Sequence, residues 1–247
     1  MQSSTRKSIT FLCALFALST SILLSVFNQL PEFPEDHKQV VQKLPRSMDD
    51  AKELARVLSL YRENHYYSVL TCLAFVYIFL QTFAIPGSIF LSVVLGFLFN
   101  FYVALFVICM CSATGATLCY LASGLVGPPL LEKYCKARID QWKASVNHHR
   151  QHMLNYIIFL RITPFLPNWF INISSPVLDV SLWPFFIGTF LGVAPPSFVA
   201  VSAGQNIYNL TTAGDALSYT SILMLAIFAI LSMLPVIFQN KLKAHFS

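Results

Sequence analysis

The stretch NYIIFLRITPF, from Asn155 to Phe165, decides how this chain folds. It is largely apolar but contains Arg161, and Pro164 and Pro167 then interrupt the apolar run. A charged side chain at the centre of a membrane helix costs roughly 2.5–3.5 kcal/mol on translocon scales, so it is normally kept only where it faces protein or a water-filled cavity. The sequence therefore predicts that Arg161 belongs to a polar pathway through a bilayer.

The composition is that of a membrane protein. Of the 247 residues, 56% are hydrophobic and 11% are charged, whereas roughly 25% of the residues of an average soluble domain are charged. A soluble chain of this length could not hide so much apolar surface. The formal net charge is only +5, and the basic residues other than Arg161 lie outside the apolar runs, so nucleic acid is not an expected partner.

The apolar runs predict six membrane spans. The first is interpreted as a retained anchor rather than a signal peptide, because its length matches the ~20 residues that cross a bilayer and no clear cleavage site follows. The six runs are Ile9 to Leu30, Tyr66 to Ala84, Phe101 to Leu125, Leu154 to Phe165, Leu182 to Val201 and Ala216 to Phe238.

Two further apolar stretches are too short to cross. One is Ile89 to Phe99, which follows Pro86 and Gly87; the other is Asn168 to Leu178, which follows Pro167. Proline removes a helical donor and clashes with the preceding turn, while glycine frees the backbone. We therefore expect a re-entrant half-helix in each half of the chain. Broken helices at corresponding positions of two halves are the best sequence indicator of a transport site.

Two polar segments separate these runs. In the first, residues 31–64, Ser47 resembles an N-cap, and apolar residues recur at helical spacing from Met48 to Tyr61. This helix is expected either to lie along the membrane surface or the domain, or to be a solvated linker helix. The second segment, Val126 to His152, is expected to be a basic connector.

The predicted fold is an all-α polytopic membrane protein, with about six transmembrane helices and two re-entrant hairpins. Residues 1–65 form the anchor and polar connector, residues 66–203 the core, and residues 204–247 the last span with a basic tail. An even number of spans places both ends on the same side of the membrane, which we expect to be the cytosol. Asn209 then lies in a lumenal glycosylation sequon, and Lys243 with His245 resembles a cytosolic retrieval signal for the endoplasmic reticulum.

We expect Arg161, Asn168, Asn172 and Asp179 to line the polar pathway. A lipid headgroup could slide along it while the tails stay in the bilayer, and the planar fork of Arg161 suits phosphate oxygens. The alternative is that Arg161 is structural, paired with Asp179 or with backbone carbonyls.

The sequence also contains a helix-packing motif, but it lacks the common catalytic and metal-binding motifs. Gly188 and Gly192 have the small-xxx-small spacing that allows close helix packing. The sequence contains no Gly-rich phosphate loop, no HExxH motif and no nucleophile elbow, and its cysteines lack zinc-ligand spacing. We therefore expect neither an enzyme nor a bound cofactor or metal, and any transport should be passive or coupled to an ion gradient.

Three stretches resemble a known family. They are Phe79 to Leu91 (FLQTFAIPGSIFL), Phe159 to Pro176 (FLRITPFLPNWFINISSP) and Phe185 to Ala203 (FFIGTFLGVAPPSFVAVSA), and the similarity extends from about Met48 to the C-terminus. The chain is identified on them as a member of the DedA/VTT-domain superfamily. The resemblance implies facing re-entrant hairpins and carries over Arg161 and the Pro86-Gly87 pair.

The resemblance also implies a function. It points to a phospholipid scramblase of the endoplasmic reticulum membrane that needs no ATP and supports autophagosome formation, lipid mobilisation and lipoprotein export. Vacuole membrane protein 1, the autophagy machinery and membrane phospholipids are the implied partners. Asp179 and Ile157 depart from the pattern, since Asp179 stands where an uncharged residue is expected and Ile157 where bacterial members often have an aromatic residue.

Two other functions remain open on the sequence. The same fold could serve an ion- or proton-coupled transporter of a small solute, with Arg161 and Asp179 as the coupling pair. It could also be a membrane scaffold that shapes lipid or holds partners, in which Arg161 is purely structural.

Overall fold

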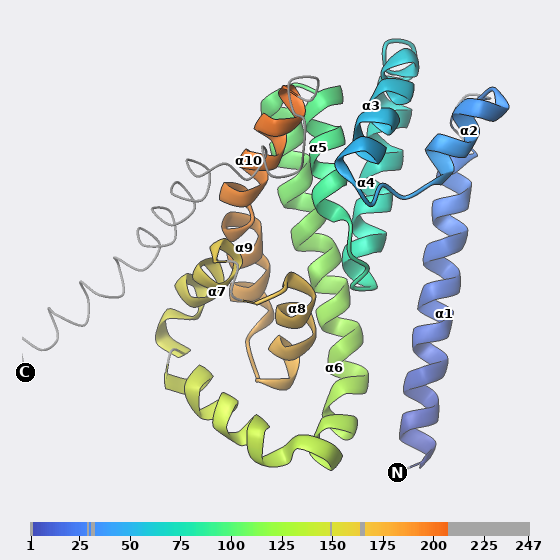
Figure 1. Cartoon of the computed structure of the whole chain (residues 1–247). Helices are drawn as coiled ribbons and strands as arrows, with labels where there is room; N and C mark the ends of the chain where they lie inside the picture. Colours follow the sequence, from blue (N-terminus) through green and yellow to red (C-terminus); the bar gives the residue numbers. More distant parts are fainter. Residues whose placement is uncertain (1, 29, 31–32, 149, 164–165, 207–247) are drawn as a thin grey trace, which may run out of the picture.

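The computed structural model describes residues 2–206 except for 29, 31–32, 149 and 164–165, and the part it describes is helical and contains no strand (Figure 1). The all-α fold is therefore confirmed for these residues. The expected span Ala216 to Phe238, the sequon at Asn209, the signal at Lys243 and His245, and Pro164 lie outside the described residues.

Three segments of the described chain are long and apolar enough to cross a membrane. They are Thr10–Phe27 in α1 (Gln2–Phe27), Phe101–Val126 in α6 (Phe101–His148), and Leu182–Gln205, which comprises α9 (Leu182–Gly192) and α10 (Ala194–Gln205). The apolar helix α4 (Tyr66–Thr82) is shorter, with 17 residues. The fold is that of a helical membrane protein that crosses more than once.

The expected single span from Leu182 to Val201 is two helices. Alpha-helix α9 ends at Gly192, and α10 restarts at Ala194 with Pro195 and Pro196 in its first turn. Proline has no N–H to donate, and it is tolerated at a helix start because the first N–H groups have no partner within the helix. The expected span is confirmed as an apolar stretch long enough to cross a membrane, Leu182–Gln205, and these two prolines explain why its helix is interrupted at Val193.

The polar segment expected as a connector is mostly a continuation of α6. This helix has 48 residues and reaches His148, and its second half turns back toward α7 (Met153–Ile162; Figure 1). A short 3₁₀ turn, η1 (Arg150–His152), joins the two helices. Polar residues do not end a helix by themselves, so the composition change at Val126 marks the end of the apolar stretch and not the end of the helix.

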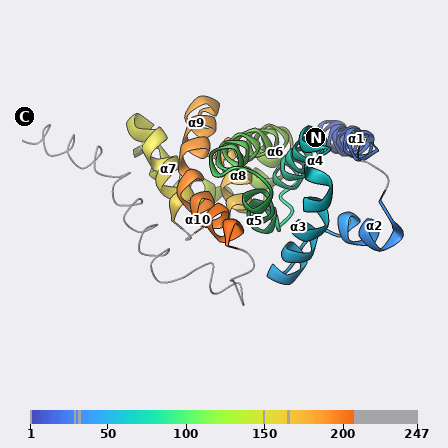
Figure 2. The same ribbon diagram turned by 90° about the horizontal axis from the view of Figure 1, so that it is seen from above.

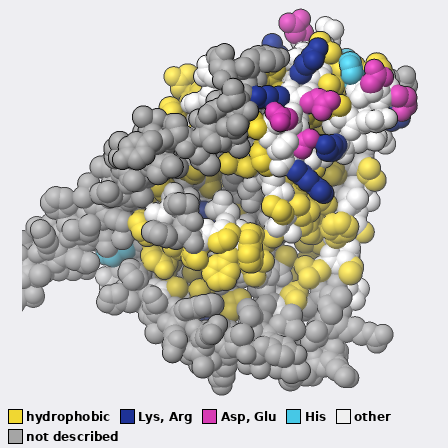
Figure 3. Space-filling model, viewed as in Figure 1, with side chains coloured by type: hydrophobic (Ala, Val, Ile, Leu, Met, Phe, Trp, Pro, Cys, Tyr) yellow, Lys and Arg dark blue, Asp and Glu magenta, His cyan; other side chains and the backbone are white. Residues whose placement is uncertain are grey.

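The helix predicted from Met48 is confirmed as α3 (Met48–Arg62), and its N-cap is Ser47, whose hydroxyl accepts from the Asp50 N–H at 3.1 Å. Its apolar side packs on α5 (Ser88–Leu98), so it lies along the domain. Its polar side is exposed, and together with α2 (Glu35–Gln42) it carries the charged residues gathered at the top of Figure 3. The solvated-linker interpretation does not fit these contacts.

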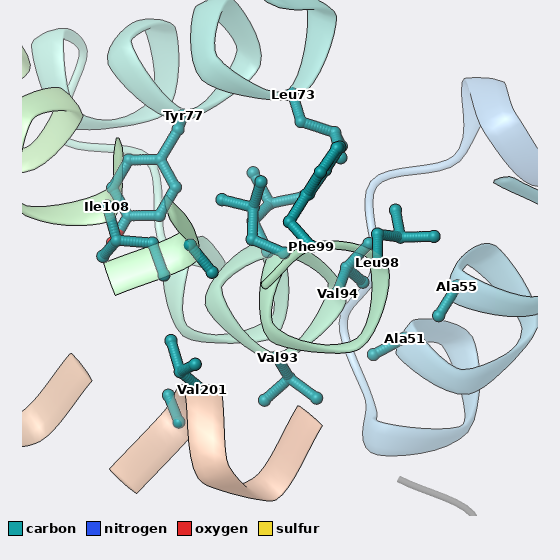
Figure 4. Close-up of a cluster of buried hydrophobic side chains, with 14 of the residues drawn as sticks. Ala51, Ala55, Leu73, Tyr77, Val93, Val94, Leu98, Phe99, Ile108 and Val201 are labelled. Atoms are coloured by element: carbon teal, nitrogen blue, oxygen red, sulfur yellow. The ribbon is translucent and has the colours of Figure 1, made fainter. Parts of the chain in front are cut away.

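The short helix α5 lies at the centre of the larger core, between α3, α4, α6 and α10 (Figure 2). Val94, Leu95 and Leu98 on α5 are completely buried, and Val93 points toward α10 (Figure 4). With 11 residues, α5 is about 16 Å long at 1.5 Å per residue, too short for a hydrocarbon layer of about 30 Å. The expected short helix after Pro86 is therefore confirmed.

Glycine permits the close approach of α5 and α10. A Cβ atom added to Gly96 would lie 2.6 Å from the Val201 carbonyl oxygen. We expect Gly96→Ala to lower the free energy of unfolding by about 1–3 kcal/mol, the usual cost of overpacking a core. The midpoint of thermal unfolding in detergent measures this loss. Gly124→Ala is the control, because its Cβ would meet the Pro176 side chain at 3.3 Å; equal midpoints would contradict the packing argument.

The start of α3 is stabilised by a charged contact. The Lys43 ammonium donates to Asp50 at 2.7 Å, and the Arg46 backbone N–H donates to the same carboxylate at 3.0 Å. These two hydrogen bonds, with a smaller contribution from Ser47, hold the pKa of Asp50 at about 2, below its ordinary value of 3.8. The lowered pKa means that the ionised carboxylate stabilises the folded state.

This contact predicts a pH dependence. Because the native pKa of Asp50 is depressed, its stabilising effect is complete above the unfolded pKa of 3.8 and disappears as the pH falls through about 2. We expect Asp50→Asn to lower the thermal midpoint at neutral pH, and the gap to wild type to close between about pH 4 and pH 2. Asp49→Asn, which keeps the Lys43 contact, is the control; a gap that is independent of pH would contradict this account.

Candidate functional site

The second break in the chain positions the candidate site. Alpha-helix α7 ends at Ile162, and α8 (Asn168–Val177) begins after Pro167, whose extended backbone (φ −61°, ψ 140°) precedes the first turn. Arg161 therefore lies in the last turn of α7, and Asn168 opens α8. The short helix expected after Pro167 is confirmed, with 10 residues.

Arg161 donates hydrogen bonds to two other helices. Its Nη2 atom donates to Asn172 Oδ1 at 2.6 Å and to Thr189 Oγ1 at 3.0 Å, and its Nε atom donates to the same hydroxyl at 3.2 Å. Its Nη1 atom donates to Asn168, to Oδ1 at 3.1 Å and to the backbone oxygen at 3.3 Å. The guanidinium carbon also lies 5.3 Å from the centre of the Phe185 ring. One side chain thus joins α7 to α8 and α9.

All of these acceptors are neutral. Arg161 is only 5% exposed, Asn172 is fully buried, and within the described part of the chain no carboxylate forms an ion pair with the guanidinium. The Nδ2 atom of Asn172 is buried as well and has no acceptor among the described residues. A buried charge is expensive unless it is paired. The site therefore carries an uncompensated positive charge and a spare N–H donor.

Two glycines bring α9 against Arg161. A Cβ atom on Gly192 would lie 2.7 Å from the Cβ of Arg161, and one on Gly188 would lie 2.8 Å from the Cβ of Ile157. The absence of side chains at these positions lets α9 approach α7 closely. Thr189, between the two glycines, is thereby placed within hydrogen-bond distance of the guanidinium.

The first break has a different environment. Gly87, with φ of +126°, precedes α5 and lies against Leu44 and the backbone oxygen of Pro45. A left-handed φ of this kind is open to glycine at little cost. The main neighbour of α5 is α10 and that of α8 is α6, so the two short helices pack on these helices rather than mainly on each other.

The four residues expected to line the pathway do not all meet. Arg161, Asn168 and Asn172 lie together. The side chain of Asp179 is 64% exposed and forms an ion pair with Lys143 at 2.7 Å. Its backbone is left-handed (φ 57°) in the turn that follows α8. The expected pairing of Asp179 with Arg161 is therefore absent from the structure, because Asp179 pairs with Lys143 instead.

Sequence reasoning also missed two contacts of the site. Thr189 is a polar residue in an apolar run between the two glycines, which was the signal that could have revealed it. Phe185 carried no such signal, because an aromatic residue in an apolar helix is ordinary.

Fold and site together define a class: a multi-pass helical membrane protein with two proline-broken helices and a buried arginine at one break. Residues 85–206 match the model of the VTT domain. The chain is 55% identical to Transmembrane protein 41B of Homo sapiens over 243 residues, which is 98% of this chain and 83% of that protein. It belongs to the transmembrane protein 41B family.

Relatives from other vertebrates support the same family assignment. Transmembrane protein 41B of Danio rerio is 54% identical over 240 residues, 97% of this chain and 85% of that protein. The protein of the same name from Gallus gallus is 54% identical over 243 residues, 98% of this chain and 90% of that protein. No solved structure is significantly similar to the chain.

The hydroxyl of Thr189 accepts two hydrogen bonds from Arg161. We expect Thr189→Val to lower the free energy of unfolding by about 1–3 kcal/mol, because it leaves buried donors of the guanidinium without an acceptor. Thermal unfolding in detergent measures the effect. Thr163→Val is the control, since Thr163 follows the end of α7 and its hydroxyl donates to the Phe159 carbonyl of that helix. An equal loss in both variants would show that the hydroxyl of Thr189 is not special.

Proposed function

We propose that this protein is a phospholipid scramblase that moves lipids between the leaflets of the endoplasmic reticulum membrane without ATP. The observation that carries the proposal is the buried guanidinium of Arg161, which has only neutral acceptors among the described residues. An anion entering the site would compensate this charge. The phosphodiester of a phospholipid is the anion that a membrane supplies at high concentration.

The geometry suggests how the headgroup is handled. Asn168 is exposed while Asn172, one turn further along α8, is buried, so polar groups lead from the surface to Arg161. A guanidinium donates two parallel N–H groups to phosphate oxygens. The unpaired Nδ2 of Asn172 adds a neutral donor. These contacts lower the cost of moving a headgroup through hydrocarbon, and the tails stay in the bilayer.

The biological setting rests on the family resemblance. In this proposal the protein supports autophagosome formation, lipid mobilisation and lipoprotein export, together with vacuole membrane protein 1 and the autophagy machinery. Residues 66–203 carry the lipid pathway, and residues 1–65 and 204–247 flank it.

A membrane scaffold is the second candidate function. Arg161 ties α7 to α8 and α9 through neutral acceptors, which is also what a purely structural residue would do. A coupled transporter that uses Arg161 and Asp179 as its ion pair finds less support, because Asp179 is bound to Lys143.

The test uses purified protein in liposomes that carry headgroup-labelled phospholipids, with a membrane-impermeant quencher and no ion gradient. We expect wild type to lose signal well beyond the outer-leaflet share, and Arg161→Ala to scramble at least about tenfold more slowly, which corresponds to about 1.4 kcal/mol of barrier. Asp179→Asn is the control and should scramble normally. Loss confined to the outer leaflet, from folded and inserted wild type, would overturn the proposal.

Asn172→Asp separates the scramblase from the scaffold. The variant places a carboxylate where an amide oxygen now lies 2.6 Å from Nη2 of Arg161. It should raise the thermal midpoint, because it pairs the buried charge, and it should slow scrambling, because the charge is no longer available to phosphate. Faster or unchanged scrambling by a stabilised Asn172→Asp protein would mean that Arg161 acts only as a structural residue.

A further inference from the structure

A second feature lies far from Arg161, on the other side of the core. Alpha-helix α1 and the chain that follows it enclose a cavity of about 490 Å³ against α3, α4 and α5. Its size falls in the range of roughly 300–1,000 Å³ that is typical of ligand sites. No residue of α7, α8 or α9 lines it. We call it the α1 cavity.

The wall of the α1 cavity is almost entirely apolar. It is formed by Leu23, Leu24 and Phe27 of α1, by six residues of α4 (Val69, Cys72, Leu73, Val76, Phe79 and Leu80), and by leucines of α3 and α5. Apart from Gln42 and Lys43 at one end, nothing in this lining could bind a polar solute. The cavity is suited to a hydrocarbon group.

One end of the cavity is polar. Gln42 and Lys43 belong to its wall, and the side chain of Lys43 is 62% exposed, so this end opens to the outside. Arg46, three residues further on, is exposed as well. The Lys43 ammonium is paired with the carboxylate of Asp50 at 2.7 Å, and Arg46 contacts the same carboxylate through its backbone N–H. This end of the cavity is polar, so it suits the headgroup of a lipid whose tail lies against the apolar wall.

The bilayer has access to this cavity. Alpha-helix α1 is apolar enough to cross a membrane, yet none of its spanning window, Thr10–Phe27, is buried by the rest of the protein. Its contacts with the core are few and lie mainly along α4. An apolar void forfeits dispersion contacts along its whole lining. Lipid tails next to α1 would restore these contacts by entering between α1 and α4.

We propose that the α1 cavity binds one acyl chain of a membrane phospholipid, with the polar headgroup of that lipid at the end formed by Gln42 and Lys43. This site is separate from the scrambling pathway and does not depend on it. It would hold a lipid between the anchor helix and the core, and so provide the packing that α1 lacks in the protein alone.

The experiment maps where a lipid tail touches the protein. Full-length protein is reconstituted into phosphatidylcholine liposomes with a small share of phosphatidylcholine that carries a photoactivatable diazirine near the end of one acyl chain. After illumination, peptide mass spectrometry locates the adducts. We expect adducts to be enriched on the cavity faces of α1 and α4 relative to exposed apolar residues elsewhere, such as Phe106 and Leu121. Equal labelling of all apolar surfaces would overturn the proposal.

A filling variant sharpens the result. Leu23→Trp adds bulk from α1 into the cavity and should reduce the α4 adducts at least severalfold, while Leu18→Trp, on an exposed part of the same helix, should leave them unchanged. Equal reductions would overturn the proposal. Labelling of α4 by a photoactivatable sterol in place of the phospholipid probe would also overturn it, since the occupant would then be a sterol.

One more variant separates this inference from the proposed function. Arg161→Ala should keep the wild-type adduct pattern, because Arg161 does not line the cavity. Loss of the cavity adducts in a folded Arg161→Ala protein would show that the two sites are one pathway and overturn their separation. Persistence of the adducts in a protein that does not scramble would leave the acyl-chain site standing without the scramblase.

Discussion

The second half of the molecule is organised by the need to solvate one buried guanidinium. Water is replaced around Arg161 by oxygen atoms from α8 and α9, so these helices must both reach the last turn of α7. That requirement explains the break at Pro167, which lets α8 begin beside the arginine, and the two glycines of α9, which bring Thr189 into range. The packing is built around a polar centre, whereas the first half is built around the apolar helix α5.

The two halves therefore share a pattern of helices, but the polar groups near their breaks differ in chemical type. The first break is followed by a buried chain of hydroxyls, in which Tyr77 contacts Ser92 at 3.2 Å and Ser112 at 3.3 Å. These groups satisfy one another and leave no charge. The second break holds a cation whose acceptors leave its charge uncompensated. A helix that is too short to cross can thus serve packing in one half and present a polar site in the other.

The sequence predicts what depends on local chemistry. Apolar runs and prolines located the short helices after Pro86 and Pro167, and Ser47 located the start of α3, because capping and proline effects act within a few residues. Asn168 and Asn172 were found because they are polar residues in the short apolar helix expected after Pro167. Thr189 was missed, and Asp179 was placed wrongly, because the partner of a buried arginine is chosen by packing across 28 residues rather than by nearness in the chain. The turn after α8 directs Asp179 outward to Lys143.

The neutrality of the acceptors is the feature that makes reversible anion binding physically reasonable. A carboxylate beside Arg161 would satisfy both its hydrogen bonds and its charge, and an anion would then have to displace it. Amide and hydroxyl oxygens accept the hydrogen bonds of Arg161 but do not neutralise its charge. The fold is therefore stabilised by these hydrogen bonds while the electrostatic potential at the guanidinium stays positive. An arriving phosphate would not have to displace an internal ion pair, and the amide and hydroxyl oxygens would keep the guanidinium hydrogen-bonded when the phosphate leaves. A site that must release what it binds benefits from this arrangement, because a passive pathway conducts only if no step along it is a deep energy minimum.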